Sequence, residues 1–199
     1  MSRAASIVRN PFVWAFVLGI VTLTALRPLL RHVPEPPPVL GEVPPFELTD
    51  PEGRPFGREA LLGHVTIADL FSTRCPAGCR EIQKGLRRIQ DAYEERRIEG
   101  ISLLSVSTDP AFDTPARLLE YARSIGARPG RWTFLTGDAE TVKRIARELF
   151  ADPSRASGPA RPLVLIDPKG RIRGWYGADE MGLDEIYNRA QHVLAETAP

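Results

Sequence analysis

The sequence predicts an α/β domain of ordinary size behind an apolar N-terminal segment. From Phe46 onward, short apolar runs alternate with helical patterns, which is typical of strands and helices built around one sheet. The run His64–Ser72 is almost continuously apolar and indicates a buried central strand. Across all 199 residues, 43% are hydrophobic and 26% are charged, so a core of normal size is available.

The apolar segment near the N-terminus predicts a membrane anchor. Residues 11–31 contain the run PFVWAFVLGIVTLTAL, slightly shorter than a bilayer crossing needs unless flanking arginines snorkel. Residues 1–10 are basic and carry no acid, which favours a cytoplasmic N-terminus. A cleaved signal peptide is the alternative. We favour a single uncleaved transmembrane helix because no small-residue cleavage site follows the run.

The stretch after the anchor predicts a spacer. Residues 32–45 are rich in proline and favour an extended polyproline segment. This assignment leaves residues 46–199 as one domain. With the N-terminus inside the cell, the domain is expected to face the periplasm or the outside of the inner membrane.

The elements of the domain follow one another in a recognisable order. FELTDPEGRPF, starting at Phe46, predicts a strand and turn of an N-terminal hairpin, and His64–Ser72 the central strand. After the cysteines, one helical face carries Ile82, Leu86, Ile89 and Tyr93, and Gly100 is expected to end that helix. The remaining elements are strand 101–107, helix 114–126 with Thr114 as N-cap, strand 132–135, helix 138–150 capped by Asp138, hairpin 162–177 and helix 182–197. This order is the thioredoxin-like plan with an N-terminal β-hairpin extension.

The two cysteines form the candidate site. STRCPAGC places Cys75 in the turn after the buried strand and Cys79 at the beginning of a helix. Unpaired N–H groups and the positive end of the helix dipole favour a thiolate there, and Arg74 and Arg80 act in the same direction. Such a pair can exchange disulfides or bind one soft metal ion. A permanent structural disulfide and two inert core cysteines are the less favoured alternatives.

Asp69 is the second candidate residue. It lies six positions before Cys75 in an apolar strand, where a carboxylate is costly without a partner or a task. Thioredoxin-type enzymes keep a buried acid at this offset to manage the proton of the second cysteine. Asp69 is therefore a candidate catalytic residue; the alternative is that it caps nearby backbone.

Four stretches resemble the Sco/SenC family of membrane-anchored, thioredoxin-fold proteins that assist copper insertion into cytochrome c oxidase. FSTRCPAGC resembles the family's F-x-x-x-C-P-x-x-C signature, and SVSTDPAFDTPARLLEY its S-x-D-P-x-x-D-T-P segment. RWTFLTGD and VLIDPKG resemble the W-x-x-L-T-G and L-I-D-P-x-G motifs. The resemblance implies Cys75 and Cys79 as copper ligands and subunit II of cytochrome c oxidase as the client.

One family feature is missing. The family's histidine ligand lies about nine residues before the proline of L-I-D-P-x-G, and counting back from Pro168 reaches Pro159 here. The chain has only three histidines, His32, His64 and His192, and none is an obvious substitute. Loss of the imidazole predicts weaker copper binding, Cu⁺ or Cu²⁺, and favours thiol chemistry.

Three functions follow as expectations. The first is copper delivery, which makes the protein a metallochaperone. The second is reduction of client thiols at the oxidase copper site, which makes the protein a thiol–disulfide oxidoreductase. An external thiol reductant would then recycle its cysteine pair. A redox sensor or general oxidoreductase that binds no copper is the alternative. A net charge of +1 gives no indication of nucleic acid. Arg161-Pro162 lies near the position where thioredoxin folds keep a cis-proline, but a plain loop proline is favoured.

Overall fold

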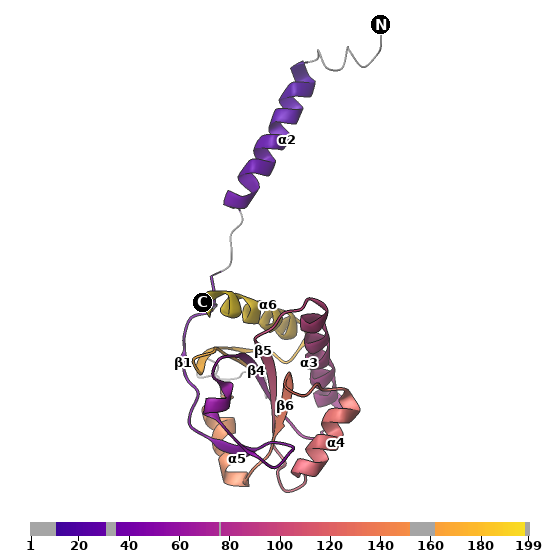
Figure 1. Cartoon of the computed structure of the whole chain (residues 1–199), viewed down its shortest axis with the longest axis vertical. Coiled ribbons are helices and arrows are strands. Elements are labelled where there is room, and N and C mark those ends of the chain that lie inside the picture. Colours follow the sequence, from indigo (N-terminus) through magenta and orange to yellow (C-terminus); the bar gives the residue numbers. More distant parts are fainter. Residues whose placement is uncertain (1–10, 31–34, 76, 152–161, 198–199) are drawn as a thin grey trace. The chain divides into compact units, whose positions relative to one another are not determined.

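The computed structural model describes residues 11–30, 35–75, 77–151 and 162–197, and gives the backbone alone for 25–30 and 77–79. The chain divides into two compact units between Glu35 and Pro36. Of the elements formed by these described residues, helix α2 belongs to the first unit and the strands belong to the second (Figure 1). The predicted cytoplasmic segment 1–10 lies outside the described residues.

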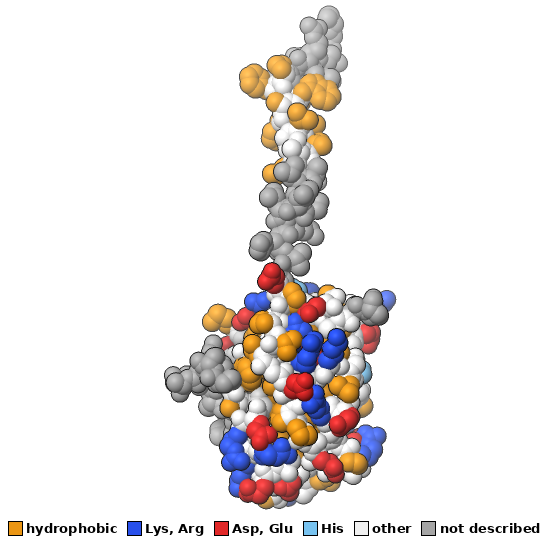
Figure 2. Space-filling model, turned by 90° about the vertical axis from the view of Figure 1, so that its left-hand side faces the viewer, with side chains coloured by type: hydrophobic (Ala, Val, Ile, Leu, Met, Phe, Trp, Pro, Cys, Tyr) orange, Lys and Arg blue, Asp and Glu red, His pale blue; other side chains and the backbone are white. Residues whose placement is uncertain are grey.

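The helix of the first unit is α2 (Pro11–Leu30), which coincides with the apolar run of the sequence. Phe12, Trp14 and Phe16 expose their side chains, and Figure 2 shows apolar groups along this helix. Among the residues that the structure describes, no helix combines the length and apolar character that crossing a membrane requires.

The second unit is built on a six-stranded sheet in the order β1-β8-β7-β4-β5-β6. The central strands β4, β5 and β6 are parallel, and β7 and β8 return antiparallel to their neighbours. Every residue of β4 is buried, as the continuous apolar run predicted. The strands are β1 (Gly41–Glu42), β4 (Val65–Phe71), β5 (Ile101–Ser107), β6 (Trp132–Leu135), β7 (Leu163–Ile166) and β8 (Arg171–Tyr176).

Helices cover both faces of the sheet (Figure 1). Residues of α3, α4 and α6 join one face of the sheet in one apolar cluster, and α5, the hairpin and η1 join the other face in a second cluster. This two-sided covering explains why the central strand is apolar throughout. The elements are α3 (Ala77–Glu95), α4 (Pro115–Ile125), α5 (Ala139–Glu148), α6 (Glu180–Thr197), η1 (Arg58–Leu61) and the hairpin strands β2 (Glu47–Thr49) and β3 (Pro55–Gly57).

The helix ends agree with most of the sequence predictions. Asp138 caps α5 by accepting hydrogen bonds from the backbone N–H groups of Glu140 and Thr141. The helix after the cysteines ends earlier than predicted, at Glu95 instead of Gly100. Arg97 takes a left-handed conformation with φ 54°, and this turn stops the helix before the glycine is reached.

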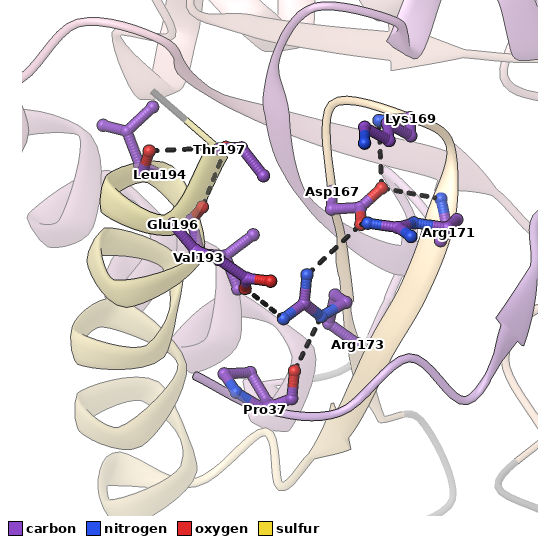
Figure 3. Close-up of polar contacts among 9 residues, drawn as sticks. All are labelled: Pro37, Asp167, Lys169, Arg171, Arg173, Val193, Leu194, Glu196 and Thr197. Carbon is purple, nitrogen blue, oxygen red and sulfur yellow. Dashed lines mark hydrogen bonds and ion pairs between the residues drawn. The ribbon is translucent and has the colours of Figure 1, made fainter. Parts of the chain in front are cut away.

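Part of the segment predicted as a free spacer, 32–45, packs against the domain. From Pro36 onward the chain belongs to the second unit, β1 pairs with β8, and the Val43 side chain is fully buried. The carbonyl of Pro37 accepts a 2.7 Å hydrogen bond from Arg173 Nε (Figure 3). The domain therefore begins about ten residues earlier than the sequence predicted.

Arg173 is the centre of a buried polar cluster at the β7–β8 turn (Figure 3). Its side chain is 2% exposed and forms ion pairs with Asp167, at 3.3 Å, and with Glu196 of α6. Arg171 pairs with the same Asp167 at 2.7 Å. We call Asp167, Arg171, Arg173 and Glu196 the Arg173 cluster. It connects the start of the domain, the β7–β8 hairpin and the last helix, α6.

Candidate functional site

The cysteine turn follows the C-terminal end of β4. After Phe71 the chain turns, and the backbone N–H of Cys75 donates to the Ser72 carbonyl at 3.1 Å. Helix α3 then begins at Ala77 and has Cys79 in its first turn. Cys75 is half-buried and disulfide-bonded. The strand–turn–helix placement predicted for the two cysteines is thus present, although the side chain of Cys79 is not among those described.

Asp113 connects this turn to the loop after β5. Its carboxylate is fully buried and accepts hydrogen bonds from the Thr73 hydroxyl, the Thr73 backbone N–H at 3.2 Å and the Ser107 hydroxyl. Two segments far apart in sequence are thereby fixed beside Cys75. Asp113 lies in the SVSTDPAFDTP motif, but its residue type and spacing did not mark it as part of the site.

Asp69 lies in β4 with its side chain 2% exposed. It accepts a 2.6 Å hydrogen bond from Gln83 Nε2 of α3 and another from the Ser105 hydroxyl of β5. Trp132 Nε1 in turn donates to the Ser105 oxygen at 2.9 Å. The predicted buried acid is therefore present, and its partners come from α3, the cysteine helix, and from the neighbouring strand.

The basic flanks of the cysteines differ from expectation in one respect. Arg74 turns away to Asp109, to which its Nε donates at 2.9 Å, and its guanidinium lies 4.1 Å from the centre of the Phe112 ring. Asp109 offsets much of the positive charge of Arg74, so Arg74 contributes less to a thiolate than the sequence suggested. Arg80, in the first turns of α3, is exposed.

Tyr121 of α4 lies beside the same region. Its ring stacks on Phe71 with 5.5 Å between ring centres. Burial raises the pKa of the Tyr121 hydroxyl to about 12, and the negative charges of Asp69 and Asp113 act in the same direction. The phenol is therefore a protonated hydrogen-bond donor at neutral pH.

The two histidines that the structure describes, His64 and His192, lie on different parts of the fold. His64 is exposed and immediately precedes β4, whereas Cys75 follows the opposite end of this strand of 7 residues. At the usual rise per residue the strand separates them by about 20 Å. His192 lies on α6. His32 and the segment around Pro159 lie outside the described residues, as does Arg161 of the Arg161-Pro162 bond.

Within the described part of the chain, no group of three or more His, Cys, Asp or Glu side chains is arranged to hold a metal ion. The chemistry that the geometry does support is that of a sulfur pair. Cys75 is disulfide-bonded just before α3, and the buried Asp69 of β4 contacts this helix through Gln83.

A sheet of this order, with a disulfide-bonded cysteine between the central strand and the helix that follows, defines a thioredoxin-like protein with a cysteine pair. The SCO1/SenC family model matches residues 39–195, and the chain belongs to this family.

Relatives and solved structures agree with this assignment. The SCO1 protein homolog of Bacillus subtilis is 26% identical over 75% of this chain and 81% of its own length. Protein SCO2 of Saccharomyces cerevisiae mitochondria is 31% identical over 74% of this chain, which spans about half of that protein. Among structures, BsSco superposes with a TM-score of 0.69 at 24% identity, over 81% of this chain and 98% of BsSco. Copper-bound ScoI of Arabidopsis thaliana gives 0.62 at 22% identity, over 76% and 98%.

Proposed function

We propose that the chain assists assembly of the copper site of cytochrome c oxidase through thiol–disulfide exchange at Cys75 and Cys79. The observation that carries this proposal is a half-buried, disulfide-bonded Cys75 at the start of α3, on the same helix–strand framework as the buried Asp69. The description of BsSco as having a disulfide switch, within a family of cytochrome c oxidase assembly proteins, supports it.

The exchange balances as a two-electron transfer. In the reduced protein, the Cys75 thiolate attacks a client disulfide and forms a mixed disulfide, releasing one client thiolate. Cys79 then displaces the client sulfur bound to Cys75, so the Cys75–Cys79 disulfide returns and the client gains two electrons. Its two sulfurs take up two protons, one that Cys79 gives up and one from solvent. An external thiol reductant resets the pair. Cys75 is the attacking residue because its side chain is partly exposed.

Asp69 is proposed to take the proton of Cys79 as that thiol becomes a nucleophile. Its described partners, Gln83 and Ser105, are neutral donors that orient the carboxylate. Asp69→Asn should slow client reduction by about a hundredfold and shift its pH profile. Ser105→Ala removes one orienting bond and should have a smaller effect on the same profile. An unchanged pH profile in Asp69→Asn would rule out this role.

Copper delivery is the second candidate function, with copper as cargo. Two thiolates suit Cu⁺, which accepts two-coordinate binding, and copper-bound ScoI of Arabidopsis is a structural relative. The position of His64, at the far end of β4, supports a weaker site than one completed by an imidazole.

One pair of measurements on the full chain in detergent separates the two functions. Reduced protein is titrated with Cu⁺ against a competing chelator, and its turnover of a disulfide peptide is followed with a thiol reductant. Exchange predicts turnover that both Cys75→Ser and Cys79→Ser abolish. A tight one-to-one Cu²⁺ complex with nitrogen ligation, without turnover, would contradict the exchange proposal and favour delivery.

Residues 11–31 are proposed to anchor the chain in the inner membrane, with the domain on the outer side. The exposed apolar side chains of α2 support this location. The protein should stay in the membrane fraction after alkaline carbonate extraction, and added protease should digest the domain in spheroplasts. Release by carbonate would contradict the anchor.

A further inference from the structure

A groove runs beside the cysteine turn between α3 and α4. Two adjoining hollows, of about 500 and 310 Å³, share Thr73, Tyr121 and Ser124. Thr73 lies two residues before Cys75, so the groove starts at the reactive turn. We define the Tyr121 groove by Thr73, Arg80, Gln83, Arg117, Tyr121 and Ser124.

The charge of the Tyr121 groove is predominantly positive. Its larger hollow is lined by Arg80, Lys84 and Arg87 and by no acid, whereas the smaller one has Arg117 and Glu120. Lys84 and Arg87 each form an ion pair along α3, at 2.7 and 2.9 Å, which reduces their effect.

Arg80 and Arg117 supply the remaining charge. Neither forms an ion pair with a carboxylate of the described residues. The Arg117 guanidinium is held 3.8 Å from the Phe112 ring centre, and its Nη1 donates to the Phe112 carbonyl at 3.0 Å. These contacts fix a cation at one end of the groove without neutralising it.

Two polar side chains, Gln83 and Tyr121, line the larger hollow. Gln83 is 4% exposed, and its Oε1 accepts no hydrogen bond from the residues that the structure describes. Its Nε2 is occupied by Asp69. The protonated hydroxyl of Tyr121 adds a donor. In the hollow that Gln83 and Tyr121 both line, the Tyr121 hydroxyl can donate to a backbone C=O group of an extended peptide.

We infer that the Tyr121 groove binds an extended, acidic segment of the client protein next to the disulfide that Cys75 attacks. The inference rests on the proposed exchange function and adds to it the class of partner. Positive potential in a groove beside a reactive group raises the encounter rate of a negatively charged partner and sets its register.

The test uses the reduced full chain in detergent and three disulfide peptides with the same cysteine spacing, flanked by acidic, neutral or basic residues. The measured quantity is the ratio of the rate constants for the acidic and neutral peptides, because dividing by the neutral rate removes any effect of Arg80 on the thiols. We expect a ratio of about ten at low salt, falling as salt screens the charges.

The double variant Arg80→Glu/Arg117→Glu should reduce this ratio to about one or below. The matched control is Arg88→Glu/Arg123→Glu, which makes the same charge change on the same two helices outside the groove and should keep the ratio. An unchanged ratio in the groove variant, or an equal loss in the control, would overturn the inference. The inference would also be overturned if the only defect of the groove variant were weaker binding to anionic lipid vesicles.

Serine versions of the peptides, which cannot exchange, separate this inference from the proposed function. Their Kd values, measured by fluorescence anisotropy, test the groove whether or not exchange occurs. Preference for the acidic serine peptide without any turnover would sustain the groove and contradict exchange. Turnover of the neutral peptide without any acidic preference would do the opposite.

Discussion

The two ends of β4 are held by different chemistry. Before its N-terminal end, the buried Asp167 pairs with two arginines, Arg171 at 2.7 Å and Arg173 at 3.3 Å. After its C-terminal end, the buried Asp113 accepts hydrogen bonds from neutral groups of Thr73 and Ser107. The buried carboxylate Asp167 thus has charged partners, whereas the described partners of the buried carboxylate Asp113 are neutral hydroxyl and amide donors.

This difference assigns the ends different tasks. A buried guanidinium that loses its carboxylate has no alternative partner. The Arg173 cluster therefore holds Pro37, the β7–β8 hairpin and α6 together in one fixed arrangement. A hydroxyl can rotate toward another acceptor at small cost. We therefore expect the cysteine end to adjust more readily than the opposite end when the disulfide is reduced.

The largest expected effect comes from removing Arg173. Arg173→Ala leaves Asp167 and the Pro37 carbonyl without their buried donor and should lower the free energy of unfolding by about 3 kcal/mol. Arg171→Ala is the matched control, because Arg171 pairs with the same carboxylate but is 30% exposed, and it should cost clearly less. Urea unfolding of the full chain in detergent measures both. Equal losses would mean that burial does not distinguish the two arginines.

Asp113→Asn tests the cysteine end. The amide replaces one acceptor oxygen by a donor facing the hydroxyls of Thr73 and Ser107, so stability should fall by about 2 kcal/mol. Because Thr73 lies beside Cys75, the equilibrium between the dithiol and the disulfide should also shift several-fold, measured against a thiol redox buffer.

Arg173→Ala is the control for that second measurement, since it should leave the dithiol–disulfide equilibrium unchanged while destabilising the fold more. If both variants shifted the equilibrium alike, the two ends would not be independent.

Acid should weaken the ion-paired end. Burial by itself would raise the pKa of Asp167, but hydrogen bonds from Arg171 and from backbone N–H groups outweigh it and hold this pKa below its ordinary 3.8. Stability from this carboxylate is therefore complete above pH 3.8 and is lost as the pH falls through the lowered pKa. Unfolding free energies measured between pH 6 and about 2 should fall less steeply in Asp167→Asn than in the unmodified protein. Parallel curves would contradict this.

Most of the fold could be predicted because its elements carry strong local patterns. The apolar run of β4 and the spacing of Leu86, Ile89 and Tyr93 on α3 identify a buried strand and a helix face without further information. Strand β1 could not be predicted, because Gly41–Glu42 has no periodic pattern. It is a strand only because the edge of β8 is available to pair with it.

The candidate site was predictable where chemistry shows in residue type. Two cysteines at a strand–helix turn and an acid inside an apolar strand are unusual, and the structure has them at these positions, while their roles stay a prediction. Gln83, Ser105 and Trp132 are ordinary residues of their elements, and no pattern marks them. The β4–β5 register places Ser105 opposite Asp69, and only this pairing brings the hydroxyl to the carboxylate.

The smallest effect expected is that of Trp132→Phe. The ring contact with Phe134, at 5.2 Å between ring centres, can persist, but the hydrogen bond from Nε1 to Ser105 is lost, which should cost about 1 kcal/mol. Trp175→Phe is a matched control, because Trp175 Nε1 also donates one bond, to the Leu149 carbonyl at 2.8 Å. Both variants should lose similar stability in urea. Only Trp132→Phe should alter the pH profile of client reduction, because its partner Ser105 orients Asp69. An equal shift of the pH profile in Trp175→Phe would show that the profile reports general loosening of the core.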